Sequence, residues 1–232
     1  MPRPAKRAVQ PRLGADSSAR RDEIRAAAGR VFAEHGFVHT TMRDVGEASG
    51  TGAGSLYHHF TSKDEILLEL LQDFYTNILR DLNAAIRDDR TPLENLQAMI
   101  ELALWYVVEH RDESRILLND YPYIVNSPVF KPVAASARTS TQIWLRVLRE
   151  ALDAGQLRPG LDVNVAFSVV ISSIFSSLRF FNPRGKLARS SYIEQVTTQL
   201  VEGLRRHGDE HHLSTGHRSS SPPSTGSVTP VM

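Results

Sequence analysis

The side chains best suited to act on a partner molecule lie between residues 41 and 63. Thr41 can cap a helix with its hydroxyl beside free backbone amides, which together form a site for a phosphate. Tyr57 supplies a hydroxyl donor, and His58 can donate a hydrogen bond or carry a positive charge. Lys63 falls in the first turn of a further helix, where the helix dipole disfavours a cation unless an anion is near. These residue types favour contact with the phosphates and base edges of a nucleic acid.

Enzymatic and metal chemistry have less support. The sequence has no Gly-x-Ser-x-Gly turn, no His-Glu-x-x-His pair and no phosphate-binding glycine loop. It contains no cysteine, which excludes disulfides, thiolate metal sites and cysteine nucleophiles. The C-terminal tail carries a group of side chains that superficially resembles a metal cluster: His207, Asp209, Glu210, His211, His212 and His217. Ordering a flexible tail around an ion costs much entropy, so we expect no metal site, no cofactor and no enzyme activity.

Three short helices are expected to hold the candidate side chains in place. Apolar residues recur at helical spacing from Ile24 to Phe32, and Gly36 fits the left-handed position that ends a helix. A second helix opens at Thr41 and a third covers 53–59, joined by a glycine-containing turn at 49–52. This outline is typical of a helix-turn-helix module, whose last helix presents its N-terminal half to base edges in the major groove.

The segment from Arg21 to Leu71 resembles the DNA-binding domain of the TetR family of transcriptional regulators. The resemblance is carried by Thr40–Val45, Gly50, Gly54–Phe60 and Ser62–Lys63. It implies a three-helix head that binds a double-stranded DNA operator, with a larger helical body behind it. Small residues at the start of the third helix suit this role because they let the backbone approach the bases closely. The residues expected to contact DNA are Thr41, Arg43, Thr51, Gly52, Ala53, Gly54, Ser55, Tyr57, His58 and Lys63.

Three residues around the turn depart from the TetR pattern. Thr51 and Gly52 replace an apolar residue and a serine, so a side-chain oxygen is lost at the start of the third helix. Gly46 replaces the usual alanine, and a glycine inside a helix costs about 1 kcal/mol. We expect these changes to alter operator affinity and sequence but not the class of protein. The core of the head is expected to comprise Phe32, Val45, Leu56 and Phe60.

The rest of the chain also follows a helical pattern, so we predict an all-α fold. A capping box from Ser62 to Glu65 opens a long fourth helix with apolar residues from Ile66 to Ile86 on one face. Further helices are expected at 93–109, 113–120, 134–154, 163–181 and 190–207. We divide the chain into a disordered basic arm (1–19), a helix-turn-helix head (20–80, with the motif at 43–62), a ligand-binding and dimerisation body (81–207) and a disordered tail (208–232).

The segment 163–181 is apolar on almost every side, and its polar positions are mostly serines. A helix without a solvated face must be buried all round, either at the centre of the core or against a second subunit. The TetR resemblance implies a homodimer through about 163–181 and 190–207, because the last two helices form a four-helix bundle in many members. Two-fold pairing would then place two recognition helices on a palindromic operator.

Aromatic residues are concentrated in the body and suggest a site for a small apolar molecule. The stretches His110–Leu118 and Phe180–Leu187 are similar to TetR-family regulators of lipid and sterol catabolism that sense acyl-CoA thioesters. Arginines near these stretches would then bind phosphates, although an ordinary core and surface salt bridges explain the same residues. The expected ligand-binding residues are Trp105, Tyr121, Arg138, Trp144, Phe167, Phe175 and Arg179.

Charge is distributed unevenly along the 232 residues, whose net charge is only +1. The first 21 residues hold six basic side chains against Asp16 alone, an arm that can track phosphates or simply be solvated. No apolar run approaches the ~20 residues that span a bilayer, and the N-terminus lacks a secretory signal. We therefore expect a soluble cytoplasmic protein with no membrane partner.

The sequence thus predicts a homodimeric repressor that leaves its operator when a small apolar or amphipathic effector, such as an acyl-CoA thioester, binds to the body. A protein of the same outline can instead coat or organise DNA without any effector. A more distant alternative is a small helical enzyme whose head binds a protein, but the basic arm and the small third-helix residues favour DNA. An increase in the protein's thermal stability on ligand binding would distinguish a ligand sensor from a DNA-coating protein.

Overall fold

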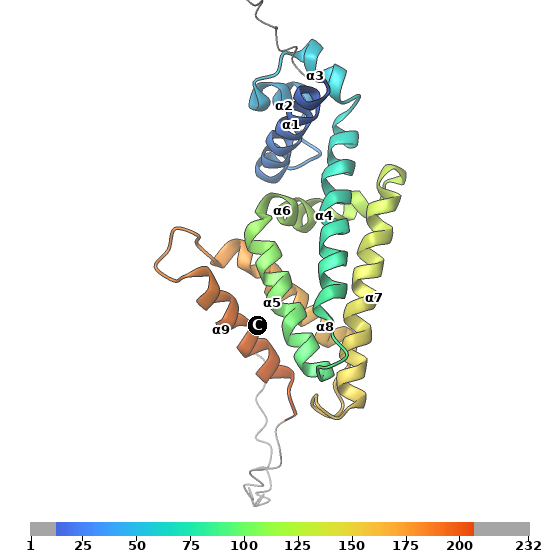
Figure 1. Cartoon of the computed structure of the whole chain (residues 1–232), viewed down its shortest axis with the longest axis vertical. Helices are drawn as coiled ribbons and strands as arrows, with labels where there is room; N and C mark the ends of the chain where they lie inside the picture. Colours follow the sequence, from blue (N-terminus) through green and yellow to red (C-terminus); the bar gives the residue numbers. More distant parts are fainter. Residues whose placement is uncertain (1–12, 207–232) are drawn as a thin grey trace, which may run out of the picture.

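The computed structural model describes residues 13–206, which form an elongated molecule built from helices (Figure 1). A small head of α1 to α3 lies at one end, and the long α4 connects it to a larger body of α5 to α9. Within 13–206 the strand-like structure amounts to one isolated bridge between Leu157 and Arg205, so the all-α prediction is confirmed. The elements are α1 (Leu13–His35), α2 (Met42–Ser49), α3 (Ala53–His59), α4 (Lys63–Ala85), α5 (Pro92–Glu109), α6 (Arg111–Asn126), the 3-10 turn η1 (Pro128–Phe130), α7 (Lys131–Asp153), α8 (Val163–Phe180) and α9 (Arg189–Leu204).

The head is held together by the apolar residues that the helical pattern singled out. Phe32, Val45, Leu56 and Phe60 are all buried, as predicted. Gly36 has a left-handed φ of 81° at the end of α1, which also agrees with the sequence pattern. The helix begins at Leu13, so its first turns occupy residues that the sequence assigned to a disordered arm.

One apolar core joins the head to the adjoining part of the body. Phe37, just after α1, packs edge-on against Phe32 and Phe130 and at a tilt against Tyr123. Leu71 of α4 belongs to the same buried cluster. Residues of α6 and η1 thus pack directly against the segment that follows α1.

The body is arranged around α5, which contacts α4, α6, α7, α8 and α9. Leu96, Ile100 and Leu104 on this helix are completely buried. α6 is longer than predicted, since it continues through Pro122 to Asn126. Proline removes one backbone donor, but Ile124 beyond it is buried and holds the last turn against the core.

α8 has two different faces within a single chain. Ile174 and Leu178 are buried against the body, whereas Val165 and Val169 are 59% and 51% exposed. The all-round burial expected from its composition is therefore not reached in one chain. With a mean hydropathy of 1.5, α8 is long and apolar enough to cross a membrane by length and composition alone. Core helices of folded proteins meet the same criterion.

Candidate DNA interface and effector cavity

A capping box and a left-handed glycine fix the geometry of α2 and the turn that follows. The Thr41 hydroxyl accepts a hydrogen bond from the Asp44 amide at 3.3 Å, and the Asp44 carboxylate accepts one from the Thr41 amide at 2.8 Å. Hydrogen bonds from the amide and hydroxyl of Thr41 hold the pKa of Asp44 below its usual range. α2 ends at Gly50, whose φ of 64° permits the tight turn into α3.

Gly46, which departs from the TetR pattern, is explained by the close approach of the turn. The Thr51 amide donates to the Gly46 carbonyl at 2.9 Å, and a Cβ at position 46 would lie 3.1 Å from the Thr51 carbonyl oxygen. Alanine at this position would push the turn by a few tenths of an ångström. The low helix propensity of glycine is thus offset by closer packing between α2 and the turn.

α3 presents a solvent-exposed face with four of the ten predicted DNA contacts, namely Gly54, Ser55, Tyr57 and His58. Leu56 is buried under the helix, while the next residue, Tyr57, is 56% exposed. Arg43 lies on α2, exposed, with its guanidinium 2.8 Å from the carboxylate of Glu47. Ala53 begins the helix. The other predicted contacts exposed on this part of the head are Thr41, Gly52, Gly54, Ser55 and His58.

Thr51 is placed differently from the expectation. Its side chain is buried, and its hydroxyl oxygen accepts from Arg20 Nη2 at 2.8 Å and from Ser49 Oγ at 3.0 Å. Arg20 also donates to the Ser49 carbonyl at 3.2 Å. These contacts hold the turn against α1, so the geometry gives Thr51 a structural role instead of a DNA contact.

Lys63 is also engaged inside the protein. Its Nζ donates to the carbonyl oxygens of Phe37 at 2.8 Å, Val38 at 3.2 Å and Thr40 at 2.7 Å. The ammonium lies 4.6 Å from the centre of the Phe37 ring as well. An ammonium has three hydrogens, and all three are used here. The sequence argument expected an anionic partner such as a DNA phosphate, whereas within the chain the ammonium is compensated by backbone carbonyl groups.

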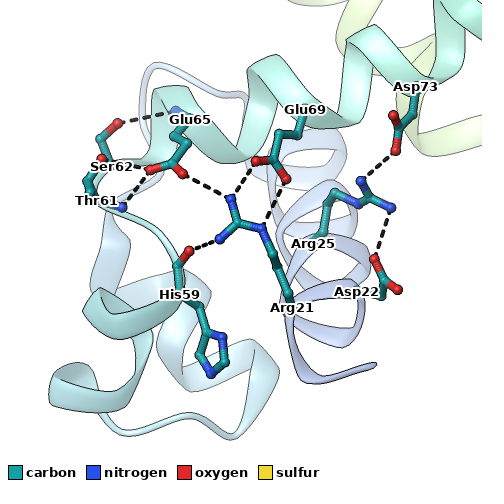
Figure 2. A network of polar contacts seen from close by, with 9 residues as sticks. All are labelled: Arg21, Asp22, Arg25, His59, Thr61, Ser62, Glu65, Glu69 and Asp73. Carbon is teal, nitrogen blue, oxygen red and sulfur yellow. Dashed lines mark hydrogen bonds and ion pairs between the residues drawn. The ribbon is translucent and has the colours of Figure 1, made fainter. Parts of the chain in front are cut away.

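An ion-pair network that the sequence analysis missed clamps α1 to α3 and α4 (Figure 2). Arg21 bonds both Glu65, at 2.9 Å, and Glu69, and it donates to the His59 carbonyl at the end of α3. Its guanidinium carbon lies 3.9 Å from the centre of the Phe60 ring. The signal was present in the sequence, because arginines 21 and 25 and acids 65, 69 and 73 each recur every four residues along one helix face.

The network also shifts the acid–base properties of its members. Hydrogen bonds from the hydroxyl and amide of Thr61, with a smaller contribution from Arg21, hold the pKa of Glu65 below its usual range. The Glu69 carboxylate is the largest cause that raises the pKa of Arg21. Both shifts favour the charged forms of Arg21 and Glu65, which form one of the ion pairs of the clamp.

The body contains a cavity of about 390 Å³ between α4, α5, α6, α7 and α8. The lining is apolar, with hydroxyl groups as its main polar contribution and no Asp, Glu, Lys or Arg side chain. Burial raises the pKa of the Tyr75 hydroxyl, so this group stays neutral. The aromatic side chains in the wall include Phe74, Tyr75, Tyr121, Trp144, Phe167 and Phe175.

Four of the seven predicted ligand residues line this cavity: Tyr121, Trp144, Phe167 and Phe175. Trp105 does not, because it lies on the outer side of α5, where it is 40% exposed and packs against Tyr106 and His110. Arg138 and Arg179 are exposed on α7 and α8 and lie outside the lining. Sequence reasoning missed Phe74 and Tyr75, since it sought the ligand site among the aromatic residues of the body (81–207) and both residues lie on α4.

Comparison with known proteins agrees with both parts of this geometry. Residues 24–70 match the N-terminal model of the bacterial regulatory proteins of the tetR family, and residues 89–204 match the tetracyclin repressor-like C-terminal domain. The chain belongs to the TetR family. The matches cover the helix-turn-helix head and the body that encloses the cavity.

Several TetR-family regulators are similar over most of this chain. KstR2 of Mycolicibacterium smegmatis, an HTH-type transcriptional repressor, is 29% identical over 88% of this chain and 100% of its own. The structure of the ketosteroid transcriptional regulator KstR2 of Mycobacterium tuberculosis has a TM-score of 0.76 at 28% identity, over 81% of this chain and 96% of its own. AibR in complex with isovaleryl coenzyme A and operator DNA shares the fold, with a TM-score of 0.67 at 21% identity over 80% and 98% of the two chains.

Two predicted features fall outside the described residues. These features are the part of the basic arm that precedes Leu13 and the histidine group at 207–217. Within 13–206 no group of three or more His, Asp or Glu side chains is placed to hold a metal ion.

Proposed function

We propose that this TetR-family protein is a homodimeric repressor that releases a palindromic operator when a small apolar or amphipathic molecule enters the cavity. The observation that carries the proposal is that α4 and α6 each touch both the cavity and the head. Phe74 and Tyr75 of α4 form part of the cavity wall, and Glu65 and Glu69 on the same helix hold Arg21. A ligand that displaces α4 therefore acts directly on the clamp.

α6 provides the second connection between cavity and head. Tyr121 lines the cavity, and the neighbouring Asp120 accepts a hydrogen bond from the Phe37 amide at 3.3 Å. Phe37 is also the residue whose carbonyl and ring bind Lys63 at the start of α4. Movement of α6 on ligand binding would thus reach the segment that precedes α2. A ligand shifts the equilibrium only by its differential affinity for two such arrangements.

The exposed face of α3 supports a role in base reading. Gly54 and Ser55 leave the backbone of its first turn open to a close partner, and Tyr57 and His58 supply polar groups beyond it. In the proposed complex this face enters the major groove, with Thr41 and its neighbouring amides on a phosphate.

The exposed side of α8 supports a dimer. Val165 and Val169 are one turn apart and exposed, and the exposed residues beside them, Ser168 and Ser172, are small. Such a strip permits close approach of a second copy, and a two-fold axis beside it would pair the two α3 helices. The centres of the two operator half-sites are then expected to lie about 34 Å or somewhat more apart.

The chemistry of the cavity supports an apolar or amphipathic effector. Its volume of about 390 Å³ lies in the range of small-molecule sites, and no charged side chain lines it. An acyl-CoA thioester fits this description if its acyl group enters and its phosphates stay outside. The similarity to KstR2, described as a ketosteroid transcriptional regulator, favours the same class of lipid-like molecules.

A thermal-shift screen of the full chain against a panel of lipid metabolites tests this proposal. Compounds that raise the melting temperature are then added to the protein bound to an operator selected from random DNA. Ala137, a buried wall residue, supplies the matched variant: Ala137→Leu extends a side chain into the cavity. We expect compounds that stabilise the wild type and release its operator, with both responses lost in Ala137→Leu while operator binding persists. Operator binding indifferent to every stabilising compound would favour the DNA-coating alternative.

A further inference from the structure

α3 is too short to fix its own orientation. It has seven residues, whereas isolated helices shorter than about 12–15 residues are only marginally stable in water. Its N-cap residue, Gly52, makes no side-chain capping hydrogen bond. The buried Leu56 anchors the middle of the helix, so the contacts at its two ends decide where the exposed side chains point.

Two consecutive arginines of α1 hold these two ends. Arg21 donates to the His59 carbonyl at the C-terminal end of α3 (Figure 2). Arg20 bonds the turn that leads into the N-terminal end, where its Nη2 lies 2.8 Å from Thr51 Oγ1 and 3.2 Å from the Ser49 carbonyl oxygen. α3 is thus attached at both ends to neighbouring side chains of one helix.

The contact between Arg20 and Thr51 is well defined on both sides. Nη1 of Arg20 donates to the Glu23 carboxylate at 2.6 Å, one turn further along α1, which fixes the direction of the planar guanidinium. Thr51 is only 7% exposed, and its amide donates to the Gly46 carbonyl at 2.9 Å. Because its side chain is buried, any effect of Thr51 on base reading must act through the position of α3.

Thr51 is also one of the positions at which this chain departs from the TetR pattern. The apolar residue expected there has no oxygen that could accept a hydrogen bond from Arg20. With threonine, the turn gains a directional hydrogen bond from a charged donor, which is stronger than one between neutral groups. Arg20 and Thr51 therefore form a pair that is a property of this chain.

We infer that Arg20 is a positioning residue for base reading: through Thr51 it sets where the first turn of α3 lies in the major groove, without touching DNA itself. This inference rests on the proposed function and deepens it, because it names a determinant of the operator sequence outside the DNA-contacting face. A binding contact must be held within about 0.5 Å of its productive geometry, so a shifted turn changes which bases fit.

The test selects bound sequences from DNA with randomised half-sites, using the full chain as wild type, Arg20→Gln, Thr51→Val and the double variant. We expect each single variant to reduce base discrimination at the same operator positions by about threefold or more, which is part of what one base contact supplies. The double variant should be no worse than the stronger single variant, because both substitutions remove the same hydrogen bond.

Two matched controls carry the same substitutions at exposed sites. Arg30→Gln on α1 and Thr76→Val on α4 should keep the base preference of the wild type. Urea unfolding of every variant is measured in parallel. A loss of stability alone lowers the folded fraction and weakens binding to all sequences equally, so a merely structural role would leave the base preference unchanged.

A direct contact between Arg20 and a DNA phosphate gives a different result. Arg20→Gln would then reduce the slope of log binding constant against log salt concentration by about one, while Thr51→Val would behave as the wild type. We expect the slope to be unchanged in both variants. The reduced slope confined to Arg20→Gln, with base preference intact, would overturn the positioning role.

The remaining outcomes separate this inference from the proposed function. If the wild type selects an operator and both single variants select the same one with the same discrimination, the positioning role is wrong while the proposed function stands. If the wild type enriches no sequence at all, the proposed function is wrong and the positioning role fails with it.

Discussion

In the head, the Lys63 ammonium donates to three carbonyl groups and the Arg21 guanidinium bonds two carboxylates and a further carbonyl. In the body, by contrast, Ser114 and one nitrogen of Arg111 find no partner within the described residues. The third unpartnered buried side-chain atom of the described chain, on Thr197, also lies in the body.

This difference in hydrogen-bond satisfaction agrees with the function proposed for each region. A recognition helix must be held rigidly, because a small displacement misplaces every contact with DNA, and intramolecular hydrogen bonds provide that rigidity. A sensor site must instead keep part of its bonding capacity for a ligand. Under the proposed function the head is complete in itself, whereas a second copy of the chain and an effector would complete the body.

The largest expected effect comes from separating the two copies. Val169→Glu places a charge on the exposed apolar strip of α8 and should convert the proposed dimer to monomers. Operator affinity should then fall by about a hundredfold or more, because the second head loses its effective concentration. Sedimentation and gel shifts measure the two effects. Val129→Glu, on an exposed valine of η1, is the control, and equal behaviour of the two variants would contradict the α8 interface.

The next effect concerns the head. Lys63→Met keeps the side-chain length but leaves three carbonyl oxygens without their donor, which should lower the free energy of unfolding by about 2 kcal/mol in urea. The exposed Arg43→Met should change it by less than about 0.5 kcal/mol. If Lys63 instead binds a DNA phosphate, Lys63→Met would leave the free energy of unfolding unchanged. It would reduce the slope of log binding constant against log salt concentration by about one.

The clamp between α1 and α4 should contribute less, because its side chains are about one-third exposed. A double-mutant cycle of Arg21→Gln and Glu69→Gln should give a coupling free energy below about 1 kcal/mol. Since Arg21 also holds the end of α3, operator binding should weaken severalfold in Arg21→Gln and remain unchanged in Arg30→Gln, an exposed position on the same helix. A coupling of zero would show that the network adds no stability.

The smallest effect is a pH dependence of the head. The pKa of Glu65 is lower in the folded state than in the unfolded chain, so its contribution to stability is complete above the unfolded pKa of about 4.3. This contribution is lost as the pH falls through the lower folded pKa. The free energy of unfolding, measured in urea, should decline between pH 6 and pH 3, and the decline should be shallower in Glu65→Gln than in the wild type. Identical slopes would show that Glu65 does not contribute to the pH dependence.

The fold and the exposed face of α3, which we propose reads DNA, were predictable because both depend on local patterns. Helical spacing, the caps at Thr41 and Ser62 and the glycine turn each act within a few residues. Even the core residues Leu56 and Phe60 follow from the same periodicity. Helix ends were less predictable where tertiary packing overrides a local signal, as at Pro122.

The roles of individual polar residues were not predictable, because their partners are remote in sequence. Lys63 binds carbonyls 23 to 26 residues away, and Arg20 reaches Thr51 across 31 residues. From sequence both basic side chains looked available to DNA. In the body, the aromatic content indicated that a cavity exists but not which residues line it, because core and lining residues are of the same types. Only the packing shows that Trp144 lines the cavity and Trp105 does not.

Hydroxyl-radical footprinting of the full chain on a selected operator tests the central claim most directly. The account predicts two protected patches on one face of the duplex, with centres about 34 Å or somewhat more apart, and loss of both patches together in Tyr57→Ala at concentrations where the wild type protects them. Continuous protection along the DNA, a single patch, or protection that is unchanged in Tyr57→Ala would contradict paired reading of the operator by α3.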